Sequence, residues 1–292
     1  ILIGLVGSEM CIRDRAKINL GLDVLGKREN GYHDVRMVMQ TVGIYDRLII
    51  TKIPEDEIRI NINLKFLPVN ENNLIYKAYK LMKDEYRFSG GIDVDLNKFI
   101  PIAAGMAGGS TDAASTMFAI NRLFELGLSN EELMKQGVKI GADVPYCIMR
   151  GTALAEGIGE KLTKLSPMPH CHIVVAKPPI NVSTKMVYES LDAGAITKHP
   201  DIDAIIEAIN EGDVKKVAER MGNVLEDVTV PMYPVIAKIK NDMISQGAYN
   251  AMMSGSGPTV FGIFPDEQTA LKCKEYLKAQ EDARQVYITE TF

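Results

Sequence analysis

The glycine-rich stretch PIAAGMAGGSTDAA, residues 101–114, constrains the fold more than any other part of the sequence. It follows GIDVDLNKFI, whose alternation predicts a strand, and it leads without a gap into a run with helical periodicity. Gly105, Gly108 and Gly109 let the backbone approach a ligand closely, and a helix beginning here offers unpaired N–H groups and the positive end of its dipole. The stretch is neither a Walker loop nor a GxGxxG fingerprint. Two interpretations stay open: a phosphate-binding loop, or a tight turn whose glycines serve sterics alone.

The hydroxyl residues and the apolar residues of this predicted helix, residues 110–126, have separate roles. We expect Ser110 and Thr111 to cap the helix and to face a phosphate or its magnesium ion. The apolar side chains recur with a period near 3.6 residues, so one face of the helix should point inward. That face consists of Met117, Ile120, Leu123 and Phe124.

Composition describes an ordinary globular protein with no electrostatic bias. The 292 residues are 46% apolar and 24% charged, which suffices for a sizeable core in one large domain or two packed ones. The net charge is −5, with both signs spread along the chain. We therefore expect neither nucleic acid nor an anionic membrane as a partner, but a small molecule whose charges are met locally. The oligomeric expectation stays open between a monomer and a homodimer.

The four cysteines show no CxxC spacing, so the sequence suggests neither a disulfide framework nor a zinc site. A reducing cytoplasm fits this usage. The run His170-Cys171-His172 carries two metal-binding residue types, but adjacent residues rarely converge on one ion and a predicted strand follows. We expect no metal there.

Residues 1–15, ILIGLVGSEMCIRDR, do not fit the pattern of the rest. The apolar run is seven residues long, far short of the roughly 20 that span a bilayer, and the flanks of a signal peptide are missing. SEMCIRDR shows neither helical nor strand periodicity. The segment resembles the translation of a transposon-end adapter used to prepare sequencing libraries. We interpret it as non-native, and expect its deletion to leave folding and activity unchanged.

The remainder predicts two α+β halves that meet near residues 151–155, at the sides of a shared cleft. We place the N-terminal domain at residues 16–153 and the C-terminal domain at residues 154–292. Strands are predicted at 16–26, 35–42, 46–53, 91–100, 151–165, 172–178 and in the second part of 252–264. Helices are predicted at 71–86, with Leu74, Ala78 and Leu81 on its inner face, and at 110–126, 129–141, 183–191, 203–212, 213–222, 234–247 and 266–280. Ser129 and Glu132 form a capping box, and Gly141 should close that helix.

Two charged residues are candidates for chemistry. Asp143 should lie just past the helix end, between Gly141 and Pro145, either as a turn aspartate or as a base that takes a proton from a substrate hydroxyl. Lys17, on an apolar strand, either snorkels to solvent or points into a cleft. Near Asp143, it would keep that carboxylate ionised and neutralise a transferring phosphoryl group.

Two turns are candidates for ligand contact. Tyr32 and His33 end the Gly/Asn turn GKRENGYH, where they either stack on or hydrogen-bond a planar ligand or lie on the surface of a hairpin. Gly255 and Gly257, in SGSGPTVF, indicate close backbone approach to another loop or to a ligand, although a simple turn fits equally well.

In this order, the stretches AKINLGLDVLGKRENGYHDV, PIAAGMAGGSTDAA, GADVPYC and MSGSGPTVF resemble the GHMP kinase superfamily from about Ala16 to the C-terminus. The stretch before AKINL departs from the family pattern. The resemblance implies a two-domain α+β fold, with a ribosomal-protein-S5-domain-2-like N-terminal domain and a ferredoxin-like C-terminal domain. Within the superfamily, the chain most resembles the members that phosphorylate the 2-hydroxyl of a CDP-linked methylerythritol in non-mevalonate isoprenoid biosynthesis. The resemblance implies that ATP and Mg²⁺ are used.

The resemblance also implies roles for individual residues. It makes Asp143 the general base and Lys17 its partner. The substrate would be bound by Asn19 at the methylerythritol and by Tyr32, His33 and Tyr188 at the cytidine. The ATP site would consist of Asn73 near the adenosine and of the loop around the phosphates: Pro101, Ile102, Ala103, Ala104, Gly105, Met106, Ala107, Gly108, Gly109, Ser110 and Thr111. The resemblance identifies no metal ligands.

Three alternatives are weighed against this function. Another small-molecule kinase of the superfamily, for homoserine or mevalonate, would not need the GKRENGYH turn. A binding protein that lost turnover should lack Asp143 or Lys17, and both are present. A membrane-anchored form would need a longer apolar run than residues 1–15 supply.

Overall fold

The computed structural model describes residues 3–6 and 8–292, so residues 1, 2 and 7 of the predicted N-terminal run lie outside the described residues. The chain is a mixed α+β protein with two sheets, as predicted. It divides into two compact units, and neither is continuous in sequence. Unit 1 contains the described residues up to Ala16, Ile44–Ile100 and Ala107–Met149; unit 2 contains Lys17–Gly43, Pro101–Met106 and Arg150–Phe292.

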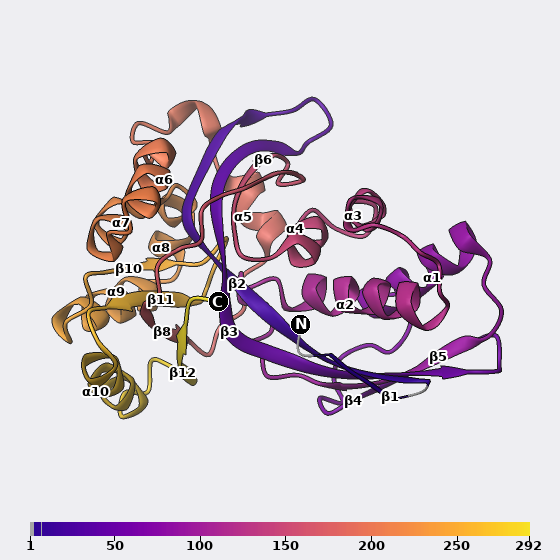
Figure 1. Cartoon of the computed structure of the whole chain (residues 1–292). Coiled ribbons are helices and arrows are strands. Elements are labelled where there is room, and N and C mark those ends of the chain that lie inside the picture. Colours follow the sequence, from indigo (N-terminus) through magenta and orange to yellow (C-terminus); the bar gives the residue numbers. More distant parts are fainter. Residues whose placement is uncertain (1–2, 7) are drawn as a thin grey trace. The chain divides into compact units, whose positions relative to one another are not determined.

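Two long strands, β2 (Glu9–Lys27) and β3 (His33–Ile53), contribute one stretch to each unit. In unit 1 the strand order is β1-β2-β3-β5-β4, with β1 at Ile3–Val6, β4 at Ile58–Ile62 and β5 at Gly91–Asn97. Strand β5 is antiparallel to β3 and parallel to β4. Figure 1 shows helices of unit 1 on one side of these strands. The helices of unit 1 are α1 (Leu74–Tyr86), α2 (Gly108–Leu123), α3 (Asn130–Gly137) and α4 (Val144–Met149).

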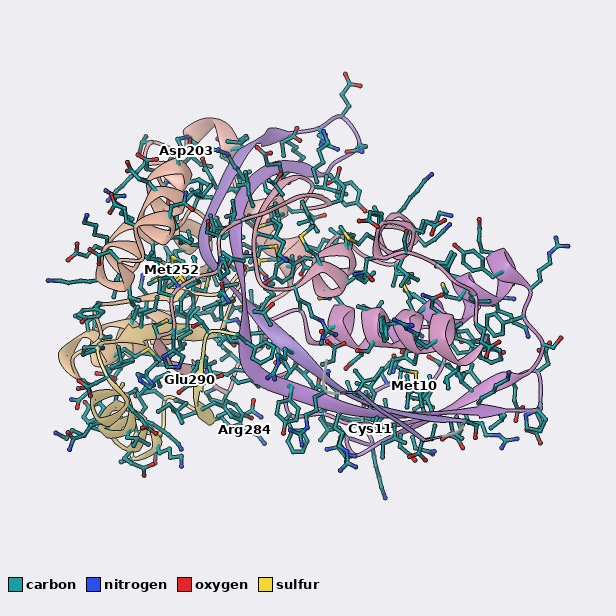
Figure 2. The ribbon with its side chains drawn as sticks, in the orientation of Figure 1. Met10, Cys11, Asp203, Met252, Arg284 and Glu290 are labelled. Atoms are coloured by element: carbon teal, nitrogen blue, oxygen red, sulfur yellow. The ribbon has the colours of Figure 1, made fainter. Side chains whose placement is uncertain are left out.

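The segment after residue 8 is a strand, so the prediction that it lacks strand periodicity is wrong. Strand β2 begins at Glu9, and Met10, Ile12 and Asp14 are buried while Glu9 and Arg13 are exposed. Figure 2 labels Met10 and Cys11 on this strand. Two apolar side chains spaced by two residues suffice to bury one face of a strand whose backbone is paired on both sides. The interpretation of residues 1–15 as non-native stays a prediction.

Two strand boundaries also differ from the predictions. The two strands predicted at 35–42 and 46–53 are one continuous strand, β3, because the intervening residues Gly43 to Tyr45 contain no proline to interrupt it. The strand predicted at 151–165 is instead a hairpin, β6 (Thr152–Gly157) and β7 (Lys161–Lys164). Gly157 and Gly159, with φ of 72° and 109°, form the turn that divides it.

Helix positions in unit 1 agree with the predictions more closely than helix faces and ends do. The capping box of Ser129 and Glu132 is confirmed, but α3 ends at Gly137 and not at Gly141. The buried face of α1 is displaced by one residue from the predicted one: it consists of Ile75, Ala78, Tyr79 and Met82. The inward face of α2 is confirmed for Met117, Ile120 and Leu123, whereas Phe124 is half-buried at the C-cap.

Unit 2 is built on an antiparallel sheet of order β10-β11-β8-β12, with strands at Asn250–Met253, Val260–Phe264, His172–Lys177 and Gln285–Glu290. Helices α9 (Val235–Ser245) and α10 (Glu267–Lys278) pack against it and against each other. Strand β6 pairs with the unit 2 stretch of β3, and β9 (Gly222–Asn223) pairs with that of β2. The other helices are α5 (Thr184–Ser190), η1 (Ala193–Ala195), α6 (Ile202–Glu211), α7 (Val214–Arg220) and α8 (Glu226–Met232).

Several elements were not predicted: β1, β4, β9, β10, β12, α4, α8 and η1. All of them are short segments whose periodicity is too brief to be assigned. Across residues 3–6 and 8–292, no helix combines the length and the apolar character needed to cross a membrane.

Candidate active site

The first half of the glycine-rich stretch, residues 101–106, packs against the loop at residues 254–257 in unit 2. The Ser254 hydroxyl donates a hydrogen bond of 3.0 Å to the Gly105 carbonyl. Gly105 has φ of 68°, and a Cβ placed on it would lie 2.0 Å from the Ser254 carbonyl oxygen. A glycine is therefore required at 105 by another loop, which is the steric interpretation. The approach predicted for Gly255 is confirmed, because its Cβ would lie 3.2 Å from the Gly105 carbonyl oxygen.

The loop at 254–257 is itself held from two sides, by residues that the sequence did not mark. The buried amide of Asn223 donates to the Met253 and Gly255 carbonyls over 2.9 and 2.8 Å. The hydroxyls of Ser256 and Thr184, the first residue of α5, share a hydrogen bond of 2.8 Å. The glycine-rich loop, the 254–257 loop and α5 are thus linked by short polar contacts.

The second half of the stretch opens α2 in unit 1. The N-cap is Ala107, in the left-handed region with φ of 57°, and no side chain in the described part of the chain caps the helix. The first backbone bond of the helix runs from the Thr111 N–H to the Ala107 carbonyl. The N–H groups of Gly108, Gly109 and Ser110 precede it. An uncapped first turn of this kind, after a glycine loop, has the donors and the dipole that bind a phosphate.

The expectation that Ser110 and Thr111 cap α2 is wrong, because both lie inside its first turn. Thr111 is fully buried and its hydroxyl donates to the Arg15 carbonyl over 3.0 Å, so that hydroxyl fixes α2 to β2. Ser110 is half-buried. Gly109 is exposed, and a Cβ on it would make only ordinary contact with Leu74, so its surroundings are open.

Lys17 and Asn19 project from the same face of β2 in unit 2, because they are two residues apart on a strand. Lys17 is 5% exposed, which excludes the snorkelling interpretation. Its Nζ donates to the Asn19 Oδ1 over 2.7 Å, and its N–H donates to the Met106 carbonyl of the glycine-rich loop over 3.2 Å. The Asn19 amide contacts the Met37 sulfur at 3.5 Å. Asn19 therefore orients the ammonium group.

Asp143 belongs to unit 1 and directly precedes α4, so it lies at a helix start and not just past a helix end. Its carbonyl accepts the Cys147 N–H over 3.0 Å, and the residue is half-buried. Pro145 is tolerated in the first turn, where its missing N–H has no intrahelical partner to lose.

His33 and Tyr188 meet in unit 2, with ring centroids 5.2 Å apart and planes at 39°. His33 is 6% exposed, its Nε2 has no hydrogen-bond partner among the described residues, and burial together with Lys27 lowers its pKa. Tyr32, the next residue back, is 58% exposed. The structure therefore joins two of the three predicted cytidine-binding residues in one aromatic pair, with an unused ring nitrogen, and leaves the third at the surface.

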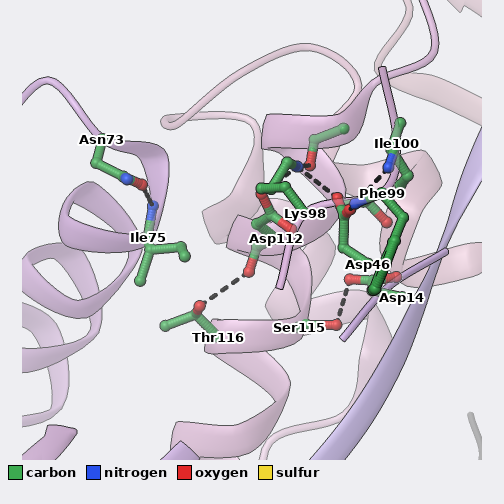
Figure 3. A network of polar contacts seen from close by, with 12 residues as sticks. Asp14, Asp46, Asn73, Ile75, Lys98, Phe99, Ile100, Asp112, Ser115 and Thr116 are labelled. Atoms are coloured by element: carbon green, nitrogen blue, oxygen red, sulfur yellow. Dashed lines mark hydrogen bonds and ion pairs between the residues drawn. The ribbon is translucent and has the colours of Figure 1, made fainter. Parts of the chain in front are cut away.

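Asn73 is the N-cap of α1 (Figure 3). Its Oδ1 accepts the Ile75 N–H over 2.9 Å and its Nδ2 donates to the Pro68 carbonyl over 2.7 Å. Both ends of the amide are therefore engaged within unit 1, and Asn73 contributes to the start of α1 whatever else it contacts.

Metal ligands are not clustered in the described residues: they contain no group of three or more His, Cys, Asp or Glu side chains arranged to hold an ion. His170 and His172 instead share Glu290, with nitrogen–oxygen distances of 3.0 and 3.4 Å, and they lower the pKa of that carboxylate.

Comparison with known proteins identifies the family. The model described as "GHMP kinases N terminal domain" matches residues 73–151, and "GHMP kinases C terminal" matches residues 205–283. A curated relative from Lachnospira eligens, named 4-diphosphocytidyl-2-C-methyl-D-erythritol kinase, is 71% identical over 281 residues, covering 96% of this chain and 98% of its own. A relative of the same name from Lachnoclostridium phytofermentans is 53% identical over 277 residues, covering 95% of each chain.

Solved structures agree with the sequence relatives. The crystal structure of a 4-(cytidine 5'-diphospho)-2C-methyl-D-erythritol kinase superposes with a TM-score of 0.83 at 29% identity, covering 97% of this chain and 99% of that one. A homoserine kinase from Cytophaga hutchinsonii, at 17% identity and a TM-score of 0.77 over 99% and 96% of the two chains, shows the same fold. This chain belongs to the GHMP kinase family, and within it to the 4-diphosphocytidyl-2-C-methyl-D-erythritol kinases.

Proposed function

We propose that this chain transfers the γ-phosphoryl group of ATP to the 2-hydroxyl of 4-diphosphocytidyl-2-C-methyl-D-erythritol, in the non-mevalonate route to isoprenoids. The observation that carries the proposal is the 71% identity to a relative of that name over 96% of the chain. A location in the cytoplasm and a monomeric or homodimeric state are part of the same proposal.

Asp143 is the proposed general base. The substrate hydroxyl is a poor nucleophile at neutral pH, and a positioned carboxylate that accepts its proton contributes roughly 10²- to 10⁴-fold. The half-buried position of Asp143 at the start of α4 supports this role, because it leaves the side chain partly accessible to a substrate hydroxyl. Lys17 is the proposed cation that neutralises charge on the transferred group, and its bond to Asn19 supports a fixed ammonium position.

The proposed ATP site combines residues 101–111 with Asn73. The uncapped first turn of α2 fits the nucleotide phosphates, and the exposed Gly109 leaves them room. Mg²⁺ fits as an ion that arrives with the nucleotide, because it is bound in kinases by one or two protein oxygens plus the phosphates and needs no all-protein cage. Ser110, half-buried in the first turn, is the hydroxyl available to it. When bound, Mg²⁺ supplies charge neutralisation at the phosphates.

Cytidine recognition is assigned to the aromatic pair of His33 and Tyr188, with Tyr32 beside it and Asn19 nearer the methylerythritol. Stacking on the pair and a hydrogen bond to the free His33 Nε2 would position a base. Since this group is remote from the reacting oxygen, its binding energy serves mainly to orient the hydroxyl.

The test is a coupled ADP-release assay with Mg-ATP on the whole chain and on Asp143→Asn. CDP-methylerythritol, homoserine and mevalonate are compared as acceptors, since all three activities occur on this fold. We expect turnover with the CDP substrate alone and a loss of at least about 10²-fold in the variant. Turnover with homoserine or mevalonate would overturn the substrate assignment. Full activity of Asp143→Asn would overturn the assignment of the base.

A further inference from the structure

A buried ion cluster lies at the start of α2 in unit 1 (Figure 3). Lys98, Asp46 and Asp112 are 8%, 0% and 4% exposed. The Lys98 ammonium donates to one carboxylate oxygen of Asp46 and, over 2.7 Å, to one of Asp112. Its third contact is the carbonyl of Gly108, the first residue of α2, at 3.2 Å. One side chain thus holds both the first residue of the helix and a residue one turn further along.

The other partners of the cluster are the backbone that enters the glycine-rich loop. The second oxygen of Asp46, on β3, accepts the N–H groups of Phe99 and Ile100 over 2.6 and 2.9 Å. Lys98 and Asp46 together therefore fix the end of the β5 segment, the entry to the loop and the first turn of α2. Asp14 on β2, which accepts the Ser115 hydroxyl, also acts to raise the pKa of Asp112.

Such a cluster is a costly way to hold a helix in place. Two carboxylates face one ammonium group, and removing all three charges from water costs free energy. Apolar side chains of the same volume often stabilise a protein as much as a buried ion pair does. Burial raises the pKa of Asp112 well above its usual range, and its Oδ1 has no hydrogen-bond partner in the described part of the chain. Burial lowers the pKa of Lys98, but the two carboxylates outweigh this effect and leave the pKa raised. The ammonium is therefore charged, and its bonds are directional.

We propose that Lys98 is a positioning residue for the nucleotide phosphates, acting through the first turn of α2. By holding the Gly108 carbonyl and the Asp112 carboxyl, it sets the direction in which the N–H groups of Gly108 to Ser110 point. Donors that bind a phosphate must keep their geometry within about 0.5 Å, and a misplacement near 1 Å costs up to about 10²-fold. This inference rests on the proposed kinase function, and it assigns Lys98 no direct contact with the nucleotide.

The test compares three variants of the cluster and one control variant with the wild-type chain. Lys98→Met removes the ammonium and leaves two buried carboxylates, so it risks unfolding. The triple variant Lys98→Met/Asp46→Asn/Asp112→Asn removes all three charges and keeps the side-chain volumes and the Asp46 acceptor. Asp112→Asn alone weakens one of the three Lys98 bonds. Lys80→Met is the matched control, because the Lys80 side chain is 60% exposed and pairs with Asp84 along α1. Circular dichroism and the melting temperature establish which variants are folded.

The readouts are the Kd of Mg-ATP from equilibrium dialysis without acceptor, and the KM values of both substrates. We expect the triple variant to be folded, with Mg-ATP binding weakened about 10-fold or more and the KM of the CDP substrate within about twofold. Asp112→Asn should weaken Mg-ATP binding by a smaller factor, and Lys80→Met should not change it.

A folded triple variant that binds Mg-ATP as the wild type does would overturn the proposal, as would equal increases in both KM values. If only Asp112→Asn folds, an unchanged Kd for Mg-ATP overturns it. A wild-type chain that binds Mg-ATP but phosphorylates none of the three alcohols would contradict the proposed function and leave this inference standing.

Discussion

Substituting Gly105 by alanine tests whether two loops far apart in sequence depend on a glycine at their contact. The new Cβ would lie 2.0 Å from the Ser254 carbonyl oxygen, so the loops must move apart by about 1 Å or more. That movement breaks the hydrogen bond from Ser254 to Gly105, which contributes about 1 kcal/mol. Repacking around an inserted methyl adds about 1–3 kcal/mol, and an alanine at φ of 68° adds about 1 kcal/mol.

The expected loss in free energy of unfolding is therefore about 3–5 kcal/mol. Gly212→Ala is the matched control, because Gly212 has φ of 74° and a Cβ there would meet nothing within 4 Å. Its free energy of unfolding should fall only by the cost of placing an alanine at positive φ, about 1 kcal/mol. Urea unfolding is followed by far-UV circular dichroism, since the chain has no tryptophan. Equal losses in the two variants would refute the reasoning, because they would mean that the loop contact contributes nothing.

Three further outcomes are expected. Asn73→Ala removes the N-cap of α1 and should lower the free energy of unfolding by about 1 kcal/mol, measured by urea unfolding, whereas an unchanged value would mean that the cap is not formed. Deleting residues 1–15 removes the buried Met10 and Ile12, so we expect the free energy of unfolding to fall by about 3 kcal/mol and the melting temperature by about 6 °C or more. An unchanged melting temperature would instead support the non-native interpretation. Burial lowers the pKa of His33 in the folded chain below its value in the unfolded chain, which is about 6.5. The contribution of neutral His33 to the free energy of unfolding is therefore fully present above about pH 6.5, and it is lost as the pH falls through the lowered pKa. In urea unfolding at pH 5 to 8, His33→Gln should flatten that part of the pH dependence, and a profile identical to the wild type would contradict this assignment.

The sequence predicted local features well, because these depend on nearest neighbours along the chain. Residue spacing sufficed for the capping box of Ser129 and Glu132, for the strand–loop–helix order around Gly105, and for the α+β class. The inward face of α1 was displaced by one residue, because Leu74 and Ile75 are equally apolar and only packing decides between them.

Contacts between distant residues were beyond such reasoning. Nothing in the pattern shows that Lys98 pairs with Asp46, 52 residues earlier, or that the Thr111 hydroxyl is used by Arg15. Buried polar residues look like surface residues in a sequence, since their partners are not adjacent. The residue pattern marked Asp143 and Lys17 as candidates and the family resemblance implied their roles, but the helix start at Asp143 and the amide that holds Lys17 required the structure.

The path of β2 and β3 through both units has a consequence for how the chain can be divided. Each strand leaves unit 1 or unit 2 in mid-course, at Ala16 and Gly43, with no linker at either point. A fragment that ends at residue 153 would carry Lys17–Gly43 and Pro101–Met106 but only the first few residues of the unit 2 stretch Arg150–Phe292. The complementary fragment would lack Lys17–Gly43, and with it Lys17, Asn19 and His33. Neither unit therefore corresponds to a contiguous segment of the chain, so neither can be expressed as an uninterrupted fragment of the sequence.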